Sequence, residues 1–316
     1  MTRLDLHMRW LLRGKVPILV GPWLSEVGFE TLYWIPFVHY LRHRYNIPKE
    51  RLIAVSRGGA SFWYDVDQHV ELLDYVPLKD LRLAQLETHA QTKSLKQTQV
   101  MPWEERLIPL IAARLGLRRY RVLHPSLMYR FFQGWWASKM SLLDCVSHLR
   151  FGPMPVLLPP PELNLPERYV AVKFYQRPTW LLNPDIQHWT EDLLGRLAAK
   201  MPIVSLSTGV PADDHTDANI PGALSLVGKV TPQNNLAIQS AVIAKSQAFI
   251  GTYGGTMQLA VRLGIPSAGF FTQFKDTAYS HKLLTEYLGT SQQKPVFVGR
   301  PAEASFVAQL MTGIQA

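Results

Sequence analysis

Strand-like and helix-like segments alternate along most of this 316-residue chain, and this alternation constrains the fold more than any other feature. In the second half, short apolar runs predict buried strands at 169–174, 202–207, 224–227, 248–251 and 267–271, the last of the series. Segments with apolar residues on one helical face predict helices at 185–200, 234–244, 257–263 and 301–312. Strands that alternate with helices are typical of an α/β fold with a parallel, doubly wound sheet.

The first half repeats this alternation less regularly. Apolar runs predict strands at 17–20, 52–56 and 121–124, and helical spacing predicts helices within 29–41 and 104–116. Between the halves, residues 153–166 contain six prolines, which lack the amide donor that a helix or a central strand needs. We therefore expect two Rossmann-like domains, 1–155 and 156–316, with the last helix able to pack back on the first domain.

Composition narrows the class of protein. The chain carries 33 Lys and Arg against 24 Asp and Glu, a formal charge of +9, which favours anionic partners without excluding a basic protein that has no special partner. The single cysteine, Cys145, excludes an intramolecular disulfide and a Cys-based zinc cluster, and it fits a reducing compartment. No apolar run reaches the roughly 18 residues of a transmembrane helix. No signal peptide is visible either, so we expect a cytoplasmic protein.

The segment 249–271, FIGTYGGTMQLAVRLGIPSAGFF, is the most specific motif of the chain. An apolar strand leads into a turn with Gly254 and Gly255, and a helix follows at once. The two glycines can adopt positive φ and let an anion approach the backbone, and Thr256 is a natural N-cap. Because a helix N-terminus offers free amides and a positive dipole end, the motif predicts a diphosphate site. The alternative is a plain strand–turn–helix junction.

This segment resembles the donor half of GT-B-fold glycosyltransferases, in which a Leu-Gly-x-Pro step and a further apolar strand follow the helix. Residues 263–266 (LGIP) and 267–271 match that pattern, and so does the proline-rich hinge. The resemblance implies two Rossmann-like domains that face each other across a cleft. It also implies transfer of a sugar from a nucleotide-sugar to a hydroxyl of a glycan or lipid-linked acceptor, in cell-surface polysaccharide biosynthesis. The donor-side Glu of many retaining enzymes has no counterpart in 253–259, so the stereochemical outcome stays open.

Two other functions remain open. A sugar-nucleotide epimerase can share this fold, and a non-catalytic protein could keep the nucleotide or glycan site alone. A NAD-dependent enzyme is disfavoured, because no G-x-G-x-x-G follows an early strand. We predict no cofactor, and we do not expect a divalent metal, since adjacent acids without a second cluster are a weak metal signal.

Further donor-site residues are expected where strands of the second half end. Cations there can meet a phosphate, and polar or small residues can hold a ribose or a base. The candidates for donor and phosphate binding are Lys173, Arg177, Thr208, Gly209, Asp214, His215, Lys229, Tyr253, Gly254, Gly255 and Thr256. The alternatives are a polar surface turn around Asp214 and a solvated Lys229.

Candidate catalytic residues lie in the first half. Glu26 and Glu30 are four residues apart, so on a helix they would share a face near its start. Either could act as the general base that removes a proton from an acceptor hydroxyl, and Gly28 between them permits close approach of that acceptor. Acids also favour a helix start for electrostatic reasons alone. We slightly prefer Glu26, and Asp65 is a third candidate base.

A second loop follows the predicted strand 52–56. Arg57 could bind a phosphate or a carboxylated sugar, with Gly58 beside it, and Trp63 and Tyr64 offer rings on which a sugar could stack. The alternative is that Trp63 and Tyr64 are core aromatics.

Segment 114–139 is the main basic feature. It has six Lys and Arg, no acids and six aromatic residues. Such a segment suits an anionic membrane surface, and it would then hold the protein peripherally at the inner membrane face. Nucleic-acid binding is not expected, although aromatic and basic residues can serve it. A pair of core helices with snorkelling arginines is the third interpretation.

Overall fold

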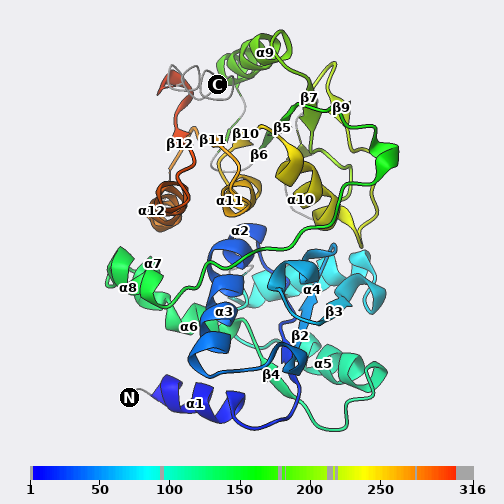
Figure 1. The fold of residues 1–316 in the computed structure, drawn as a ribbon, viewed down its shortest axis with the longest axis vertical. Helices are drawn as coiled ribbons and strands as arrows, with labels where there is room; N and C mark the ends of the chain where they lie inside the picture. The colour runs from blue at the N-terminus through cyan, green and yellow to red at the C-terminus, as the bar shows by residue number, and fades with distance from the viewer. Residues whose placement is uncertain are drawn as a thin grey trace. The chain divides into compact units, whose positions relative to one another are not determined.

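A computed structural model describes residues 3–92, 96–176, 180–181, 183–211, 216–217, 220–274 and 276–303. The chain forms two compact units (Figure 1). The first unit holds Met1–Pro155 and Pro232–Ala237, and the second unit holds Val156–Thr231 and Ile238–Ala316. The proline-rich stretch 153–166 forms no helix or strand apart from a 3-10 turn at Pro161–Leu163.

The first unit is built on a four-stranded parallel sheet. Its strands are β1 (Ile18–Val20), β2 (Leu52–Ser56), β3 (Gln68–Glu71) and β4 (Arg121–Leu123), in the spatial order β3-β2-β1-β4. The chain therefore moves outward from β1 to β3 and then returns to the other side of β1 for β4. This reversal makes the gap between β1 and β4 the topological switch point, where ligands of doubly wound sheets bind beyond the carboxyl ends of the strands.

Helices flank this sheet. They are α1 (Arg3–Leu12), α2 (Val27–Phe29), α3 (Ile35–Arg44), α4 (Leu78–Thr92), α5 (Pro102–Arg114), α6 (Ser126–Phe131), α7 (Gln133–Trp136) and α8 (Leu142–Ser147). A π-helical turn at Glu30–Trp34 joins α2 to α3, and 3-10 turns cover Lys49–Arg51, Ala60–Tyr64 and Leu72–Asp74. The sheet residues Leu19 and Ile53 pack against Leu107 and Ile111 of α5.

Three of the six aromatic residues of segment 114–139 lie inside the first unit. Tyr129, Phe132 and Trp135 are buried. They form a cluster of rings with residues of the α2–α3 region; for example, Phe132 lies 5.5 Å from Phe37 and 6.0 Å from Tyr33. These three rings therefore belong to the core, whereas Tyr120, Phe131 and Trp136 are half-buried.

The second unit is built on a six-stranded parallel sheet. Its strands are β5 (Val170–Lys173), β7 (Ile203–Ser205), β9 (Leu224–Ser225), β10 (Ala248–Thr252), β11 (Ser267–Phe270) and β12 (Val296–Gly299), in the order β12-β11-β10-β5-β7-β9. The strand order again reverses once, and the switch point lies between β5 and β10. The short strands β6 (Tyr175–Gln176) and β8 (Thr216–Asp217) form a separate antiparallel pair.

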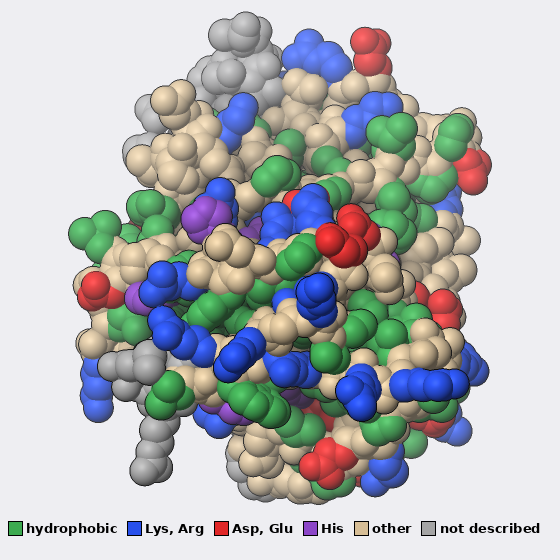
Figure 2. Space-filling model, turned by 60° about the horizontal axis from the view of Figure 1, so that its bottom comes forward, with side chains coloured by type: hydrophobic (Ala, Val, Ile, Leu, Met, Phe, Trp, Pro, Cys, Tyr) green, Lys and Arg blue, Asp and Glu red, His purple; other side chains and the backbone are tan. Residues whose placement is uncertain are grey.

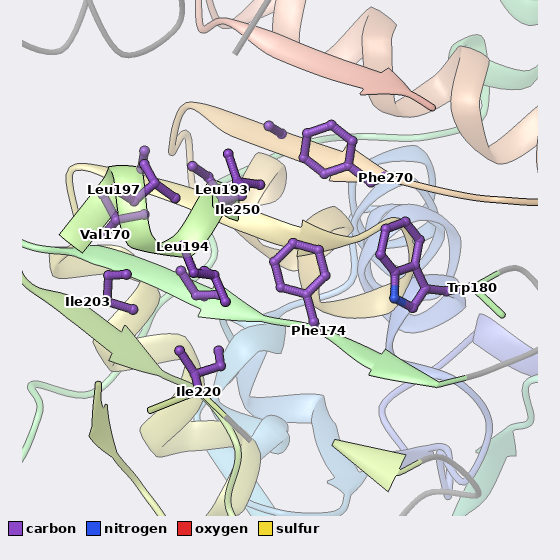
Figure 3. Packing of buried hydrophobic residues seen from close by; sticks show 13 residues of the cluster. Val170, Phe174, Trp180, Leu193, Leu194, Leu197, Ile203, Ile220, Ile250 and Phe270 are labelled. Atoms are coloured by element: carbon purple, nitrogen blue, oxygen red, sulfur yellow. The ribbon is translucent and has the colours of Figure 1, made fainter. Parts of the chain in front are cut away.

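The helices of the second unit are α9 (Pro184–Ala198), α10 (Asn235–Lys245), α11 (Gly255–Arg262) and α12 (Asp276–Ser291), with a 3-10 turn at Pro301–Glu303. Helix α10 begins in the residues assigned to the first unit and continues in those of the second. Figure 3 shows Leu193, Leu194 and Leu197 of α9 gathered with Val170 and Ile250 of the sheet. These apolar contacts bury one face of α9 and leave its charged residues exposed.

The α/β class with doubly wound parallel sheets is confirmed by both strand orders. Two details of the prediction are wrong. The strand at 267–271 is not the last, because β12 follows it. Thr256 is not the N-cap of its helix, because α11 begins at Gly255 and Gly254 is the N-cap. Of the helix expected at 301–312, residues 304–312 lie outside the described part of the chain.

Candidate functional site

The switch point of the second unit brings the diglycine turn next to the end of β5. Gly251 of β10 pairs with Lys173 of β5, so neighbouring strands deliver Lys173 and the turn Tyr253-Gly254-Gly255 to one edge of the sheet. Gly254 is extended, with φ 168° and ψ −158°, and no side chain caps α11 there. The backbone amides of the first turn of α11 are therefore available to an anion at this edge.

The backbone of this turn differs from the expected one. Neither glycine supplies the positive φ that the sequence suggested, since Gly254 is extended and Gly255 is helical. What glycine supplies instead is the absence of a side chain at the helix start, where Gly255 and Thr256 are half-buried and open to solvent. Close approach of a ligand to the backbone is compatible with that geometry.

Lys173 gives this edge a nearly buried cation. Its Nζ donates a hydrogen bond to Oε1 of Gln239 at 3.0 Å. Tyr253 is also buried, its hydroxyl accepts a bond from Gln258 at 3.4 Å, and burial raises the pKa of its phenol well above the ordinary value. Tyr253 is thus an uncharged side chain of the turn, whereas Lys173 contributes positive charge at the end of the neighbouring strand β5.

Strands β7 and β9 end at the same edge, beyond β5. Thr208 after β7 is buried, and Gly209 has φ +70°, a conformation that favours glycine. Lys229 after β9 is exposed. The sheet therefore gathers Lys173, Thr208–Gly209, Lys229 and the diglycine turn along one edge. Arg177, Asp214 and His215 lie outside the described residues.

A hollow of the second unit lies elsewhere. It measures about 680 Å³ and is lined by α9 and by residues 201–203 and 220–223, where β7 and β9 begin. None of the donor candidates that the structure describes lines it. Because ligands of doubly wound sheets bind beyond the carboxyl ends of strands, we do not place the nucleotide in this hollow.

In the first unit, the switch point carries the loop between β1 and α2. This loop ends at Glu26, which is exposed, precedes α2 and makes no capping hydrogen bond to that helix. Lys96 lies near enough for the charge of Glu26 to act on it, although burial is the larger effect and lowers the pKa of the lysine. The carboxylate of Glu26 is thus open to solvent at the edge where ligands bind.

Glu30 is in the opposite situation. It is fully buried in the π-helical turn, and its Oε1 accepts hydrogen bonds from Ser56 Oγ at 2.6 Å and Tyr64 OH at 2.7 Å. Burial raises its pKa to about 7, although these two hydrogen bonds and the charge of Arg57 act against that shift. Glu30 therefore does not share an exposed face with Glu26. Gly28, between them, is buried as well.

The loop after β2 is held tightly by the protein itself. The amides of Gly58 and Gly59 donate to the carboxylate of Glu71 at 3.0 and 2.6 Å, and the carbonyl of Gly58 accepts from Leu236 and Ala237 at the start of α10. Both backbone polar groups of Gly58 are thus used internally. Burial raises the pKa of Glu71 to about 7, against the effect of the backbone amides that it accepts.

Arg57 is buried, and its Nη2 donates to the carbonyl of Ser25 at 2.9 Å, in the loop that bears Glu26. The hydroxyl of Ser25 in turn shares a hydrogen bond with Tyr129 at 2.9 Å. Arg57 therefore connects the loops after β1 and β2 and brings positive charge near Glu30.

The contacts of Trp63, Tyr64 and Asp65 indicate structural roles. Trp63 and Tyr64 are buried, so their rings offer no open face for a sugar to stack on. Asp65 pairs with Lys49 at 2.6 Å and with Arg42 at 3.4 Å. Burial acts to raise the pKa of Asp65, but Lys49 and Arg42 outweigh it and lower that pKa. A carboxylate held by two cations is a weaker base than a free one.

A buried polar network that the sequence did not reveal supports the Glu26 loop. Oε1 of Gln97 accepts from the amide of Leu24 at 2.8 Å, and its Nε2 donates to the carbonyl of Pro22 at 2.8 Å and to Glu104 at 2.7 Å. The contacts with Leu24 and Pro22 join residues more than 70 positions apart, and no local pattern marks them. Gln97 therefore fixes the backbone just before Ser25 and Glu26.

His124, directly after β4, completes this network. Its Nδ1 accepts from the amide of Ser126 at 3.1 Å, and its Nε2 lies 3.0 Å from Oε1 of Glu104. Because Nδ1 is an acceptor, the ring proton sits on Nε2 and is donated to the carboxylate. Glu104 also accepts from the amide of Met101 at 2.8 Å. The hydrogen bonds among Gln97, Glu104 and His124 thus stabilise the backbone at the switch point between β1 and β4.

A metal-binding cluster and a membrane-spanning helix are both absent from the part of the chain that the structure describes. Within it, no group of three or more His, Cys, Asp or Glu could hold a metal ion. Among its helices, none combines the length and the apolar character that crossing a membrane requires.

No protein-family model matches this chain, and no curated protein sequence does. Solved structures give similarities that cover most of the chain. One is E. coli heptosyltransferase WaaC with ADP, at 15% identity and a TM-score of 0.47, covering 93% of this chain and all of that one. A family 9 glycosyl transferase from Veillonella parvula has 13% identity and a TM-score of 0.47, covering 96% of this chain and 90% of that one.

The E. coli ADP-heptose LPS heptosyltransferase II has 13% identity and a TM-score of 0.45, covering 81% of this chain and 85% of that one. All three of these proteins are glycosyltransferases. At TM-scores below 0.5 the similarities carry no weight of their own, so what this chain does has to follow from its own residues.

Proposed function

We propose that this protein is a glycosyltransferase that moves a sugar from a nucleotide-sugar to a hydroxyl of a glycan or lipid-linked acceptor. The observation that carries the proposal is the switch point of the second unit. There an uncapped helix start, an approachable diglycine backbone and the cation Lys173 occupy adjoining strand ends. This combination suits a diphosphate, and the resemblance of 249–271 to glycosyltransferase donor sites supports the same assignment.

Donor binding is assigned to this edge. The diphosphate would lie against the amides of Gly255 and Thr256, and Lys173 would offset part of its charge. Thr208, Gly209 and Lys229 follow the next strands outward, β7 and β9, and would contact the nucleoside. Arg177, Asp214 and His215 remain predictions for the same site.

Activation of the acceptor is assigned to Glu26. In a transfer with inversion, a base removes the proton of the acceptor hydroxyl as its oxygen attacks C1 of the sugar. The bond from C1 to the diphosphate breaks, and the leaving nucleoside diphosphate keeps the electron pair and is stabilised by the helix N-terminus. Among the three candidate bases, only Glu26 is both exposed and located at a switch point. Glu30 is enclosed, and Asp65 is paired with two cations.

The pathway and the place of action are part of the proposal. The acceptor would belong to cell-surface polysaccharide assembly, on the cytoplasmic side of the inner membrane. Segment 114–139 would contact the anionic surface through its cations, since three of its six rings are buried in the core.

Replacement of Glu26 by Gln tests this assignment. Nucleoside diphosphate release is measured with a panel of nucleotide-sugars, with and without a mixture of glycan acceptors. We expect Glu26→Gln to lower turnover by at least about 100-fold and to leave donor affinity unchanged, since general base catalysis contributes roughly 10²–10⁴. Glu50→Gln, another exposed glutamate, is the matched control and should keep full turnover.

The outcome also separates the alternatives. An epimerase would convert the donor without any acceptor. A non-catalytic binding protein would bind the donor and show no turnover that depends on Glu26. Either result would overturn the assignment of Glu26 as the base of a glycosyl transfer.

A further inference from the structure

Helix α1 has an apolar face that the described residues leave exposed. Met8, Leu11 and Leu12 are buried against the first unit. On the other side of the helix, Leu6 is 51% exposed and Trp10 is 63% exposed. Tryptophan is one of the most buried residue types on average, so an outward-facing ring at this position calls for an explanation.

Trp10 is held in place by the protein rather than left loose. The guanidinium of Arg121 lies 5.1 Å from the ring of Trp10, and its Nη1 donates to the carbonyls of Trp10 and Leu11 at 2.5 and 2.8 Å. Arg51 donates to the carbonyl of Leu12 at 3.2 Å. These arginines satisfy the C-terminal carbonyls of α1 and fix its exposed face on the edge of the sheet where β2 and β4 begin.

Cations surround this apolar face. Arg9, Arg13 and Lys15 are exposed on α1 and just after it, and Arg118 and Arg119 are exposed just before β4. Asp5 is the one acid in the sequence of α1, and no Asp or Glu occurs in 6–20 or in 106–130. Figure 2, which brings the lower end of Figure 1 forward, shows many Lys and Arg side chains on this side with hydrophobic side chains between them.

We propose that α1, together with the arginines before β4, docks the protein on an anionic membrane surface. Helix α1 would lie in the plane of the interface, with Leu6 and Trp10 inserted among the lipid headgroups and the cations facing the negative charge. An amphipathic helix with tryptophan on its apolar side and basic residues around it is typical of interfacial binding. A nucleic acid would use the cations but has no use for an aliphatic side chain such as Leu6.

This surface lies at the opposite edge of the sheet from Glu26. Helix α1 leads into the start of β1, whereas the Glu26 loop follows its end. Membrane docking by α1 would therefore leave the switch-point edge turned away from the bilayer. The inference rests on the membrane placement in the proposed function, since Arg118 and Arg119 belong to segment 114–139, and it adds α1 as the docking element. It needs no step of sugar transfer.

Co-sedimentation of the full chain with lipid vesicles tests the proposal. We expect the protein to bind vesicles of phosphatidylcholine with about one-third phosphatidylglycerol, to bind pure phosphatidylcholine at least about tenfold less, and to be released by salt. The double variant Leu6→Ser/Trp10→Ser should lose most of this binding. Leu158→Ser removes a side chain that is 90% exposed outside α1, and it should bind like the wild type.

The charge variant Arg9→Glu/Arg13→Glu keeps Trp10 and its contact with Arg121, so it tests the surface if the serine variant proves unstable. A tenfold or greater loss of vesicle binding, with an unchanged melting temperature, is the expected result. Equal binding to neutral and anionic vesicles, no binding by the wild type, or wild-type binding by this variant would overturn the proposal. Nucleotide-induced stabilisation of the same samples reports separately on the proposed function.

Discussion

At the scale of single residues, two glutamates four positions apart have opposite environments. Glu26 is exposed at the end of a loop, and Glu30 is enclosed with Ser56 and Tyr64 as its partners. The spacing suggested a shared helical face, but the chain changes from loop to helix at Val27 and then widens into a π-helical turn. Single-turn π-helical stretches are frequent at functional sites, and this one turns Glu30 into the core.

Glu30 makes the stability of the protein depend on pH. With a pKa of about 7 in the folded chain and 4.5 as its ordinary value, it holds a proton between these pH values only in the folded state. The free energy of unfolding therefore falls as pH rises from about 4.5 to about 7, by on the order of 3 kcal/mol for this group.

The variant Glu30→Gln should reduce this loss, because glutamine stays neutral and can still accept from Ser56 and Tyr64. Urea unfolding between about pH 5 and pH 8 provides the measurement. Part of the slope should remain, since Glu71 has a pKa raised to a similar value. A pH dependence identical to that of the wild type would show that Glu30 is not a buried, raised-pKa carboxyl.

At the scale of elements, the loops after β1 and β2 are fixed by side chains from distant parts of the chain. Gln97 and Glu104 hold the loop before Glu26, and Glu71 holds the loop after β2. Such contacts cannot be predicted from one sequence, because the partners share no local pattern. The buried strands could be predicted, since parallel strands covered on both faces are continuous apolar runs.

The missed elements lack that signal. Strand β3 lies at a sheet edge and buries only Val70, and α4 buries only Leu81 and Thr88 over 15 residues. Edge strands and surface helices with so few buried residues show little periodicity in their sequence. The same reason accounts for β12, an edge strand whose first two residues are only half-buried.

Removal of the Gln97 side chain should loosen the Glu26 loop. In Gln97→Ala, the amide of Leu24, the carbonyl of Pro22 and Glu104 each lose a buried partner, so we expect a destabilisation on the order of 3 kcal/mol. If Glu26 is the base, turnover falls as well while donor affinity is kept. The exposed Gln99 offers a matched control, because Gln99→Ala removes only a weak contact with Met101. Equal melting temperatures for Gln97→Ala and Gln99→Ala would show that Gln97 does not stabilise the Glu26 loop.

Gly59 tests how the loop after β2 meets α10. Its φ is +78°, and an added Cβ would lie 2.5 Å from Cβ of Ala237. Gly116 has a similar φ of +68° with open space around it, so Gly116→Ala should cost only the backbone strain of about 1–2 kcal/mol. Gly59→Ala should cost clearly more and speed hydrogen exchange at the amides of Leu236 and Ala237. An equal loss of stability in Gly59→Ala and Gly116→Ala would contradict close packing of Gly59 against Ala237 of α10.

At the scale of the whole molecule, both units repeat one plan. In each sheet the chain starts at a central strand, builds outward through two strands, and then crosses to the other side of the first. The alternation of apolar runs was enough to predict this class, because a doubly wound sheet needs little more than strands and helices in turn. The switch points follow from the observed strand orders, and they coincide with the Glu26 loop and the diglycine turn.

Thermal stabilisation by nucleoside diphosphates tests whether a diphosphate binds at the start of α11. Wild type, Gly255→Asp and Gly195→Asp are melted with a panel of UDP, GDP, ADP, CDP and TDP. Gly195 lies in α9 of the same unit with open space around it, so its variant controls for the added charge. Ligand at about 100 times its dissociation constant adds about 2.7 kcal/mol, which moves the melting temperature visibly.

We expect one nucleotide to stabilise the wild type and Gly195→Asp, and to have no effect on Gly255→Asp, whose carboxylate would occupy the phosphate position. Stabilisation that survives in Gly255→Asp would contradict the placement of the diphosphate at the start of α11. If no member of the panel stabilised the wild type, the proposal that this protein binds a nucleotide-sugar would be contradicted.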